Sequence, residues 1–340
     1  MRTSLQHYPL HFKVPAGTSR GVMTEKQSWF VRISDGTKEG IGEISVIEGL
    51  SPEYVSLEEF EQTIHHFLSQ LEHGWNEDLR HALQPYPSIL FGIESAILDL
   101  KHGGHRIYFA NAFARGEQKI PINGLIWMGD EQSMLAQIEE KLASGFTTIK
   151  MKIGAIGIET ELALLKGIRN RYSAGEITLR VDANGAFDEN SAKEILEKLA
   201  ALDIHSIEQP ILAGQHAAMT RLCRNTPIPI ALDEELIGIT DRNEKIHVLE
   251  HIRPQYIILK PSLHGGISGT QEWIQLAQER HIQWWMTSAL ESNVGLEVIC
   301  QLAGEYDNGL PQGLGTGSLY TNNVDSTLMV EKGMIYRKLS

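Results

Sequence analysis

Alternating apolar and polar positions mark the first third of the chain as an antiparallel sheet. Residues 29–33 and 39–44 both follow this pattern, and the polar, glycine-containing stretch between them is typical of a hairpin turn. Two helices are expected next. Residues 56–59 read Ser-Leu-Glu-Glu, a capping box, with apolar residues at helical spacing behind it, and a second apolar helix face runs over 88–101. We therefore predict an α+β domain over residues 1–118.

After residue 121 the pattern changes to short apolar strands that alternate with helical stretches. Such repetition predicts a parallel sheet with helices on its outside. The expected strands cover residues 122–127, 147–153, 178–181, 206–208, 228–233, 256–260 and 283–287, followed by a short last strand near Gly313. A closed barrel over 119–318 is favoured over an open doubly wound sheet, because polar residues stand at many strand ends and no Gly-x-Gly-x-x-Gly follows the first strand. The tail, residues 319–340, shows no strand–helix unit of its own and is expected to pack back on the first domain.

Three of these strands end on a carboxylate or directly before one. Asp182, Glu208 and Asp233 each stand where an apolar strand gives way to a turn, at nearly equal spacing. In a parallel barrel the carboxyl ends of the strands meet at one rim, where three carboxylates form an oxygen-only site for a hard divalent cation. A single such residue would more often be a helix cap or a surface turn. Three in consecutive units favour a metal site, because unpaired buried carboxylates are costly.

Lysines on two other strands complete the candidate site. Lys150 and Lys152 are two residues apart on the second strand, so their side chains share one face, which is the barrel interior if Ile149 and Met151 face the helices. The alternative is an edge strand with solvated lysines. Lys260 ends the sixth strand, opposite the second in an eight-stranded barrel, so it and Lys152 are expected on opposite sides of one ligand. Neighbouring positive charges favour the neutral form of a lysine, and the neutral form is the one that acts as a general base.

Composition and charge narrow the class of protein. The 340 residues are 42% hydrophobic and 21% charged, as in an ordinary globular chain of enzyme size. A formal net charge of −13 without a basic stripe argues against a nucleic-acid partner. Cys223 and Cys300 are expected to be buried thiols, since they form no metal-spaced cluster. No apolar run approaches the roughly 20 residues of a membrane helix, and the N-terminus lacks a signal-peptide core, so we expect a cytoplasmic protein without a membrane partner.

The Lys-x-Lys pair, the three strand-end carboxylates and the later lysine resemble the enolase superfamily, and within it the muconate-lactonising subgroup. The resemblance extends over essentially the whole chain. It implies an α/β fold, a modified TIM barrel of the (β/α)7β type with an α+β N-terminal capping domain. It also implies that Mg²⁺, or Mn²⁺ in its place, binds to Asp182, Glu208 and Asp233.

The same resemblance assigns roles to the lysines. It implies that Lys152 removes a proton α to a substrate carboxylate, while Lys260 sits on the opposite face. Lys150 would neutralise carboxylate charge beside Lys152, and Asn184 would be a neighbouring substrate-binding group. A non-catalytic scaffold is a further alternative, but the complete motif set argues against it.

Two C-terminal stretches point to one reaction within the subgroup. Residues 287–295 and 313–317 resemble those members that dehydrate 2-succinyl-6-hydroxy-2,4-cyclohexadiene-1-carboxylate to o-succinylbenzoate in menaquinone biosynthesis. Dipeptide epimerases typically carry Asp-x-Asp near the last strand, where this chain has Gly-Leu-Gly-Thr-Gly. The implied partner is a small carboxylate bound by Ser288, Gly315 and Thr316, although turn formation is another use for such glycines. An N-acylamino acid racemase or a dipeptide epimerase is the alternative, since lysines on both faces suit racemisation.

A polar segment near the N-terminus is a candidate lid. Residues 18–23 follow one glycine and include another, and they are expected to close over the site, with Arg20 contacting the substrate. The 14 histidines show no metal-spaced pattern and receive no role. No feature of the sequence indicates an oligomeric state.

Overall fold

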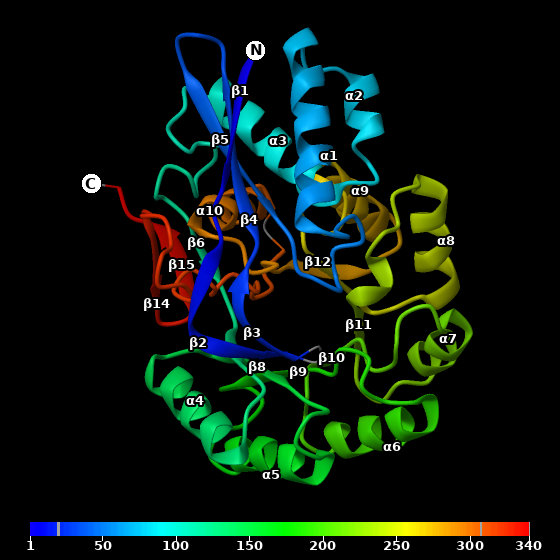
Figure 1. Ribbon diagram of the computed structural model, residues 1–340. Helices are drawn as coiled ribbons and strands as arrows, with labels where there is room; N and C mark the ends of the chain where they lie inside the picture. Colours follow the sequence, from blue (N-terminus) through cyan, green and yellow to red (C-terminus); the bar gives the residue numbers. More distant parts are fainter. Residues whose placement is uncertain (19–20, 307, 340) are drawn as a thin grey trace.

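The computed structural model of the protein describes residues 1–18, 21–306 and 308–339. Its first third forms an antiparallel layer, and the rest of the chain forms a curled parallel sheet wrapped by helices (Figure 1). The fold therefore has the mixed α/β character expected from the sequence.

The antiparallel layer contains three strands and the helices that follow them. Its strands, in spatial order, are β1 (Arg2–His7), β4 (Ser28–Ser34) and β5 (Glu39–Ser45). Its helices are α1 (Leu57–Gln70), η1 (Leu71–His73), α2 (Glu77–Ala82) and α3 (Pro87–Lys101). The predicted hairpin and both predicted helices are confirmed, and Ser56 caps α1 by accepting the N–H of Glu59. α3 packs so closely on β5 that a Cβ on Gly42 would lie 1.9 Å from the carbonyl oxygen of Gly92.

The main sheet consists of parallel strands only. In spatial order it contains β13 (Gln283–Met286), β12 (Tyr256–Leu259), β11 (Ile230–Leu232), β10 (Ser206–Glu208), β9 (Thr178–Asp182), β8 (Thr148–Lys152) and β7 (Gly124–Ile126). The helices after these strands are α4 (Glu131–Ala143), α5 (Ile158–Arg169), α6 (Glu189–Ala200), α7 (His216–Arg224), η2 (Glu234–Leu236), α8 (Arg242–Ile252), α9 (Gly266–Glu279) and α10 (Asn293–Ala303). Figure 1 shows α4 to α8 around the outside of the curled sheet. The predicted strand–helix repetition is confirmed.

Two isolated parallel bridges connect the outer edges of the main sheet. Gln312 pairs with Ile122, shortly before β7, and Gly313 pairs with Thr287, directly after β13. The short strand expected near Gly313 is therefore present as two bridging residues. Through them the last part of the main sheet reaches back to its first strand.

The tail forms a hairpin that the sequence pattern did not reveal. It consists of β14 (Leu328–Glu331) and β15 (Met334–Arg337), and β15 pairs in turn with β6 (Lys119–Pro121). The sequence predicted no strand–helix unit here, and it did not predict these two strands either. Lys332 and Gly333 form the turn with φ of 50° and 71°, a conformation that suits tight hairpins. Only the single glycine signals this turn in the sequence.

A separate two-stranded hairpin consists of β2 (Leu10–Thr18) and β3 (Gly21–Lys26), and it lies near the ends of β8 and β9 (Figure 1). The chain segment before β14 holds its base. Asn322 Oδ1 accepts a 2.9 Å hydrogen bond from the N–H of His11, and its Nδ2 donates at 2.8 Å to the carbonyl of Pro9. The tail thus contacts the first third of the chain as well as β6.

The hydrophobic interior lies mainly between the main sheet and its helices. Strand residues that face the helices are fully buried: Ile149, Met151, Leu179, Val181, Ile207, Ile257 and Leu259. The other face of the same strands points into the curl of the sheet, where polar side chains gather. Cys223 and Cys300 are free and buried, as expected. Within the described ranges, no helix combines the length and the apolar character needed to cross a membrane.

Candidate active site

Three carboxylates stand at the carboxyl ends of neighbouring strands. Asp182 is the last residue of β9, Glu208 is the last of β10, and Asp233 directly follows β11. Asp182 and Glu208 are register partners, so their side chains project from the same face of the sheet. All three are buried. The strand ends identified in the sequence therefore bring the three acids to one rim of the main sheet.

β8 brings two lysines to the same rim. Because its alternate residues are buried against the helices, Lys150 and Lys152 point into the curl of the sheet, as the alternation predicts. The Lys150 ammonium group lies 2.9 Å from Asp182 and also hydrogen-bonds Glu208. The Lys152 ammonium group donates to Asp182 Oδ2 at 3.1 Å and to Asn184 Oδ1 at 2.7 Å. Both lysines therefore neutralise the carboxylates around them.

A third lysine approaches the acids from the other side. Lys260 follows β12, so β9, β10 and β11 lie between its strand and β8. Its ammonium group donates to both carboxylate oxygens of Asp233, at 2.7 and 2.5 Å. Glu234 accepts a 2.9 Å hydrogen bond from Asn184 Nδ2. Lysines from β8 and from the end of β12 thus flank the three strands that carry the acids.

Burial and charge attraction shift the pKa values at this rim. Burial by itself would lower the pKa of Lys150, but the carboxylates of Asp182 and Glu208 outweigh it, and the pKa rises. Burial opposes the ionisation of Asp182, yet the two lysines of β8 outweigh burial and lower its pKa. Burial is the largest effect on Glu208 and raises its pKa to about 7. For Lys260 the charge of Asp233 outweighs burial and raises the pKa.

The rim offers oxygen ligands, but lysines lie between them. Across residues 1–18, 21–306 and 308–339, no three His, Cys, Asp or Glu side chains are close enough together to hold a metal ion. The ammonium groups instead supply the positive charge that buried carboxylates need. The donor set still suits a hard divalent cation, because all three acids provide oxygen. Glu208 Oε1 is also buried without a hydrogen-bond partner among the described residues, and such a cation would satisfy it.

The rim opens into a cavity of about 960 Å³, which the three lysines also line. Among the residues expected to contact a substrate, Asn184, Ser288, Gly315 and Thr316 all line this cavity. Thr316 Oγ1 donates a 2.8 Å hydrogen bond to Ser288 Oγ. Arg20 lies outside the described residues, so its role stays a prediction. The structure therefore brings the described members of the expected substrate set to the same cavity as the lysines.

The cavity wall includes residues that the sequence pattern missed. Lys26, at the end of β3, is 3% exposed and hydrogen-bonds Ser45. Asn123, just before β7, is 4% exposed, and its Oδ1 lacks a hydrogen-bond partner in the described part of the chain. Residues 21–23 of the expected lid also line the cavity. A polar residue in an apolar strand is a weak signal for Asn123, and a lysine in an alternating edge strand gives no signal at all.

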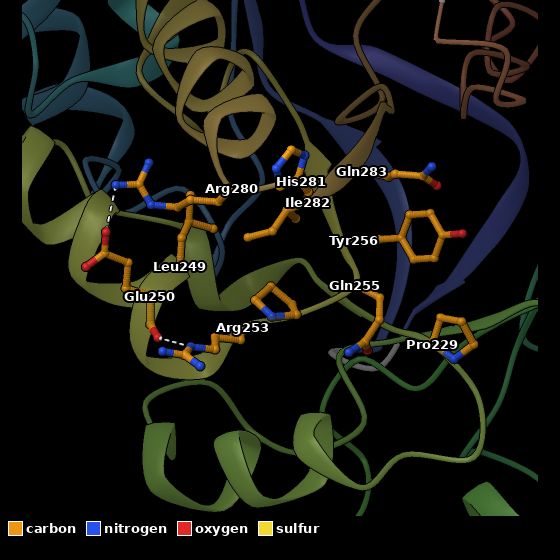
Figure 2. Close-up of a pocket in the computed structure, with 11 residues that line it drawn as sticks. Pro229, Leu249, Glu250, Arg253, Gln255, Tyr256, Arg280, His281, Ile282 and Gln283 are labelled. Carbon is orange, nitrogen blue, oxygen red and sulfur yellow. Dashed lines mark hydrogen bonds and ion pairs between the residues drawn. The ribbon is translucent and has the colours of Figure 1, made fainter.

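A second cavity, of about 590 Å³, lies at the opposite ends of the strands. Figure 2 shows Arg253, Tyr256 and Arg280 in its wall. Arg280 pairs with the carboxylate of Glu250 at 2.9 Å, and Arg253 Nε donates to the carbonyl of Glu250 at 3.0 Å (Figure 2). None of the strand-end acids or their lysines lines this cavity. Of these two cavities, the one of about 960 Å³ is therefore the candidate active site, because the acids and lysines lie there.

Comparison with known families identifies the superfamily of the chain. Residues 133–338, more than half of the chain, match the family described as Enolase C-terminal domain-like, and residues 1–100 match the family described as MenC, N-terminal domain. The chain therefore belongs to the enolase superfamily. The resemblance to the enolase superfamily that the sequence suggested is confirmed.

Individual relatives show which members of the superfamily this chain is similar to in sequence and in structure. The o-succinylbenzoate synthase of Desulfotalea psychrophila (strain LSv54 / DSM 12343) is 46% identical to this chain and covers 98% of both chains. The solved structure of MenC from Desulfotalea psychrophila LSv54 is 42% identical, covers 99% of both chains and has a TM-score of 0.85. The L-Ala-D/L-Glu epimerase from Bacillus subtilis has a TM-score of 0.86, covering 99% of this chain and 96% of its own, but its 22% identity shows a likeness of fold alone. Within the superfamily, the chain is thus similar to o-succinylbenzoate synthase along its whole length.

Proposed function

We propose that the chain catalyses the o-succinylbenzoate synthase reaction, the syn dehydration of 2-succinyl-6-hydroxy-2,4-cyclohexadiene-1-carboxylate to o-succinylbenzoate in menaquinone biosynthesis. It would act as a carbon–oxygen lyase. The observation that carries the proposal is the rim where lysines from β8 and from the end of β12 flank three buried carboxylates. The choice of reaction is supported by the 46% identity with the Desulfotalea enzyme over 98% of both chains.

We interpret the fold as the barrel and capping domain that the family resemblance implies. The curled sheet together with its two closing bridges is taken as a (β/α)7β modified TIM barrel over residues 119–318. Residues 1–118 are taken as the capping domain and residues 319–340 as the tail that packs back on it. This division is supported by the cavity, whose wall contains residues from the first third of the chain as well as from the strand ends.

Asp182, Glu208 and Asp233 are assigned as the ligands of one Mg²⁺ ion, which Mn²⁺ can replace. When bound, such a cation stabilises the negative charge that develops on the substrate carboxylate as the α-proton leaves. Glu208 fits this role because its Oε1 is buried without a partner within the described ranges, so it has an acceptor site to offer. Lys150, between Asp182 and Glu208, would then balance the added carboxylate of the substrate.

Lys152 is assigned as the base. In its neutral form it takes the proton from the ring carbon that bears the carboxylate. The electron pair of that C–H bond first moves toward the carboxylate, and it then forms the new ring double bond as the C–O bond to the neighbouring hydroxyl breaks. Lys152 returns the proton to this hydroxyl on the same face, so water leaves and the ring becomes aromatic. Asn184 Oδ1 lies 2.7 Å from Lys152 Nζ. This contact orients the amine both for taking the α-proton and for returning it to the hydroxyl.

Lys260 is assigned a different task from Lys152. Its pKa is raised because the charge of Asp233 outweighs the effect of burial, so it stays protonated and provides positive charge on the other side of the ring. Ser288, Gly315 and Thr316 are assigned to the succinyl end of the substrate. Their support is the shared cavity wall and the hydrogen bond between Thr316 and Ser288.

An N-acylamino acid racemase or dipeptide epimerase is the second candidate. It is favoured by one observation: lysines approach the acids from both sides, which is what a two-base reaction needs. Against it stands the stretch from Gly313 to Gly317, which lacks the acidic pair that would hold a substrate ammonium group.

The test is to supply the purified protein with Mg²⁺ and, separately, the cyclohexadiene carboxylate and an N-succinylamino acid in deuterated water. We expect rapid loss of the diene and slow or absent α-proton exchange in the amino acid. Rapid exchange and racemisation of the amino acid, with barely any dehydration of the ring, would establish the second candidate instead.

A further inference from the structure

Gln209, directly after Glu208, connects the chain segments that carry the three acids. It is fully buried, and its φ of 39° lies in the left-handed region, where residues other than glycine are uncommon. Its backbone N–H donates to the carbonyl of Ala231 in β11 at 2.9 Å. Its carbonyl accepts from the N–H of Gly185, in the turn after Asp182, at 2.7 Å. The main chain of this residue thus ties β10 to both neighbouring segments at the rim.

The side-chain amide of Gln209 extends the same connection. Its Oε1 accepts hydrogen bonds from the N–H groups of Asp233, at 3.1 Å, and Glu235, at 3.2 Å. Its Nε2 donates to the carbonyl of Ile211 and to Glu235 Oε2, both at 3.0 Å. An amide has two acceptor positions and two donor protons, so all four are used. The side chain is therefore fixed in one orientation.

Asp233 depends on this contact for its backbone conformation. Its φ of −126° and ψ of −83° lie outside the helical and strand regions, so the surrounding structure must hold it there. Gln209 Oε1 accepts its N–H group in a fully buried position. Removing the acceptor would leave that N–H buried without a partner, which is costly enough to shift the turn. Because the backbone conformation determines where the carboxylate points, such a shift would move the carboxylate of Asp233.

We propose that Gln209 is the positioning residue that orients the backbone of Glu208 and Asp233 so that both carboxylates can reach one shared divalent cation. The inference rests on the metal role given to these acids in the proposed function. Gln209 acts through the backbone of its neighbours, since its amide hydrogen-bonds neither carboxylate in the described structure. Groups outside the ligand set that orient metal ligands typically change metal affinity by about 10–100-fold when they are replaced, and we use this range for Gln209.

Gln301 on α10 offers a matched control. It is also buried, and its Oε1 accepts the N–H groups of Tyr108, at 2.8 Å, and Phe109, at 3.2 Å. Its Nε2 donates at 2.9 Å to the carbonyl of Arg106. It does not line the cavity of the acids. Gln301→Met therefore removes a comparable set of hydrogen bonds at a distance from the rim.

The experiment measures Mg²⁺ affinity by titration calorimetry of the metal-free protein, without substrate, for the wild type, Gln209→Met and Gln301→Met. We expect Gln209→Met to bind Mg²⁺ about 10–100-fold more weakly. Gln301→Met should lower the melting temperature of the metal-free protein by about as much as Gln209→Met does. Its affinity for Mg²⁺ should stay that of the wild type. Gln209→Asn, which keeps an amide on a shorter side chain, is the second variant if Gln209→Met does not fold.

Unchanged Mg²⁺ affinity in a folded Gln209 variant overturns the inference. Equal weakening in Gln301→Met also overturns it, because the effect would then follow from lost stability. Failure of the proposed metal site has a different signature, since the wild type itself would bind no Mg²⁺. Dehydration of the ring substrate is not used as a readout, so the assignment of the reaction is tested separately.

Discussion

The Lys152 ammonium group donates a 2.7 Å hydrogen bond to Asn184 Oδ1, and the Asn184 amide donates in turn to Glu234 at 2.9 Å. Asn184 has a φ of 44°, a conformation that asparagine and glycine adopt more readily than other residues. Its side chain therefore links the proposed base to a second segment of the rim.

Replacing Asn184 by glycine tests this link without adding backbone strain. We expect Asn184→Gly to lower kcat by about a hundredfold, the size of effect that a misplaced reacting group produces, with little change in KM. Steady-state kinetics on the cyclohexadiene carboxylate measures both constants. A raised KM at unchanged kcat would contradict the positioning role and would make Asn184 a substrate contact, as its sequence position suggested.

The metal assignment predicts a reversible dependence on divalent cations. Activity should disappear in excess chelator and return with Mg²⁺ or Mn²⁺, and Glu208→Gln should weaken Mg²⁺ binding because one charged oxygen ligand is lost. Glu94→Gln is the matched control, since Glu94 is a buried carboxylate that accepts hydrogen bonds from Ile267 and Ser268 instead. Calorimetry and activity are both measured, and full activity in chelator would refute the assignment.

The two lysines should respond differently to substitution. Lys152→Ala should reduce turnover by at least the roughly 10²- to 10⁴-fold expected for loss of a general base. Lys260→Arg should keep part of the dehydration activity, because a positive charge remains even though arginine does not match the geometry of lysine. A two-base racemase would lose its reaction in both variants, since a guanidinium group does not release its proton. Equal loss of dehydration in both variants would therefore contradict the assigned division of roles.

The partly buried His205 is expected to make the free energy of unfolding fall at acidic pH. It precedes β10, and burial, with a smaller effect from the charge of Arg180, lowers its pKa from 6.5 to about 4. The folded protein thus binds this proton less readily than the unfolded chain. The stabilising contribution is complete above pH 6.5 and is lost as the pH falls toward 4.

Urea unfolding between these two pH values should show the wild type losing more stability on acidification than His205→Gln. His65→Gln, at an exposed position of α1, is the control and should follow the wild type. Parallel pH dependence in the wild type and His205→Gln would show that the ring does not resist protonation in the fold.

Two glycines should respond to alanine in opposite directions. A Cβ on Gly42 would lie 1.9 Å from the backbone oxygen of Gly92, so Gly42→Ala should cost about 1–3 kcal/mol as α3 is pushed from β5. A Cβ on Gly167, inside α5, would meet no atom within 4 Å. Gly167→Ala should therefore stabilise the protein by about 0.5–1 kcal/mol through helix propensity alone. Melting temperatures measure both effects, and a neutral Gly42→Ala would contradict the tight contact.

Local patterns were enough to place the acids and lysines. A strand of five residues fixes which side chains share a face, so the alternation around Lys150 and Lys152 determined that both point away from the helices. The ends of apolar runs likewise placed Asp182 and Glu208 at strand termini, and parallel topology brought them to one rim. These parts of the site depend only on periodicity and on strand direction.

Features that depend on distant contacts could not be predicted in this way. The insertion of the Lys150 ammonium group between Asp182 and Glu208 depends on distances across three strands, which periodicity does not give. Asn123 and Lys26 line the same cavity although they are far apart in the sequence, so only the folded structure brings them together. The hairpin of the tail was not predicted, because it is short and its strand β15 pairs with β6, which is distant in the sequence.

The pairing of β15 with β6 also has a consequence for how the molecule is made. β1, β4 and β5 are complete once Ser45 has been added, whereas β6 and Ile122 must wait for residues 334–336 and Gln312. Domains generally fold as units in the order in which they leave the ribosome. The antiparallel layer is therefore available early on the nascent chain, and the main sheet receives its closing bridge near the end of synthesis. A message truncated before residue 312 would yield a chain that has every acid and lysine of the rim but cannot close the sheet around them.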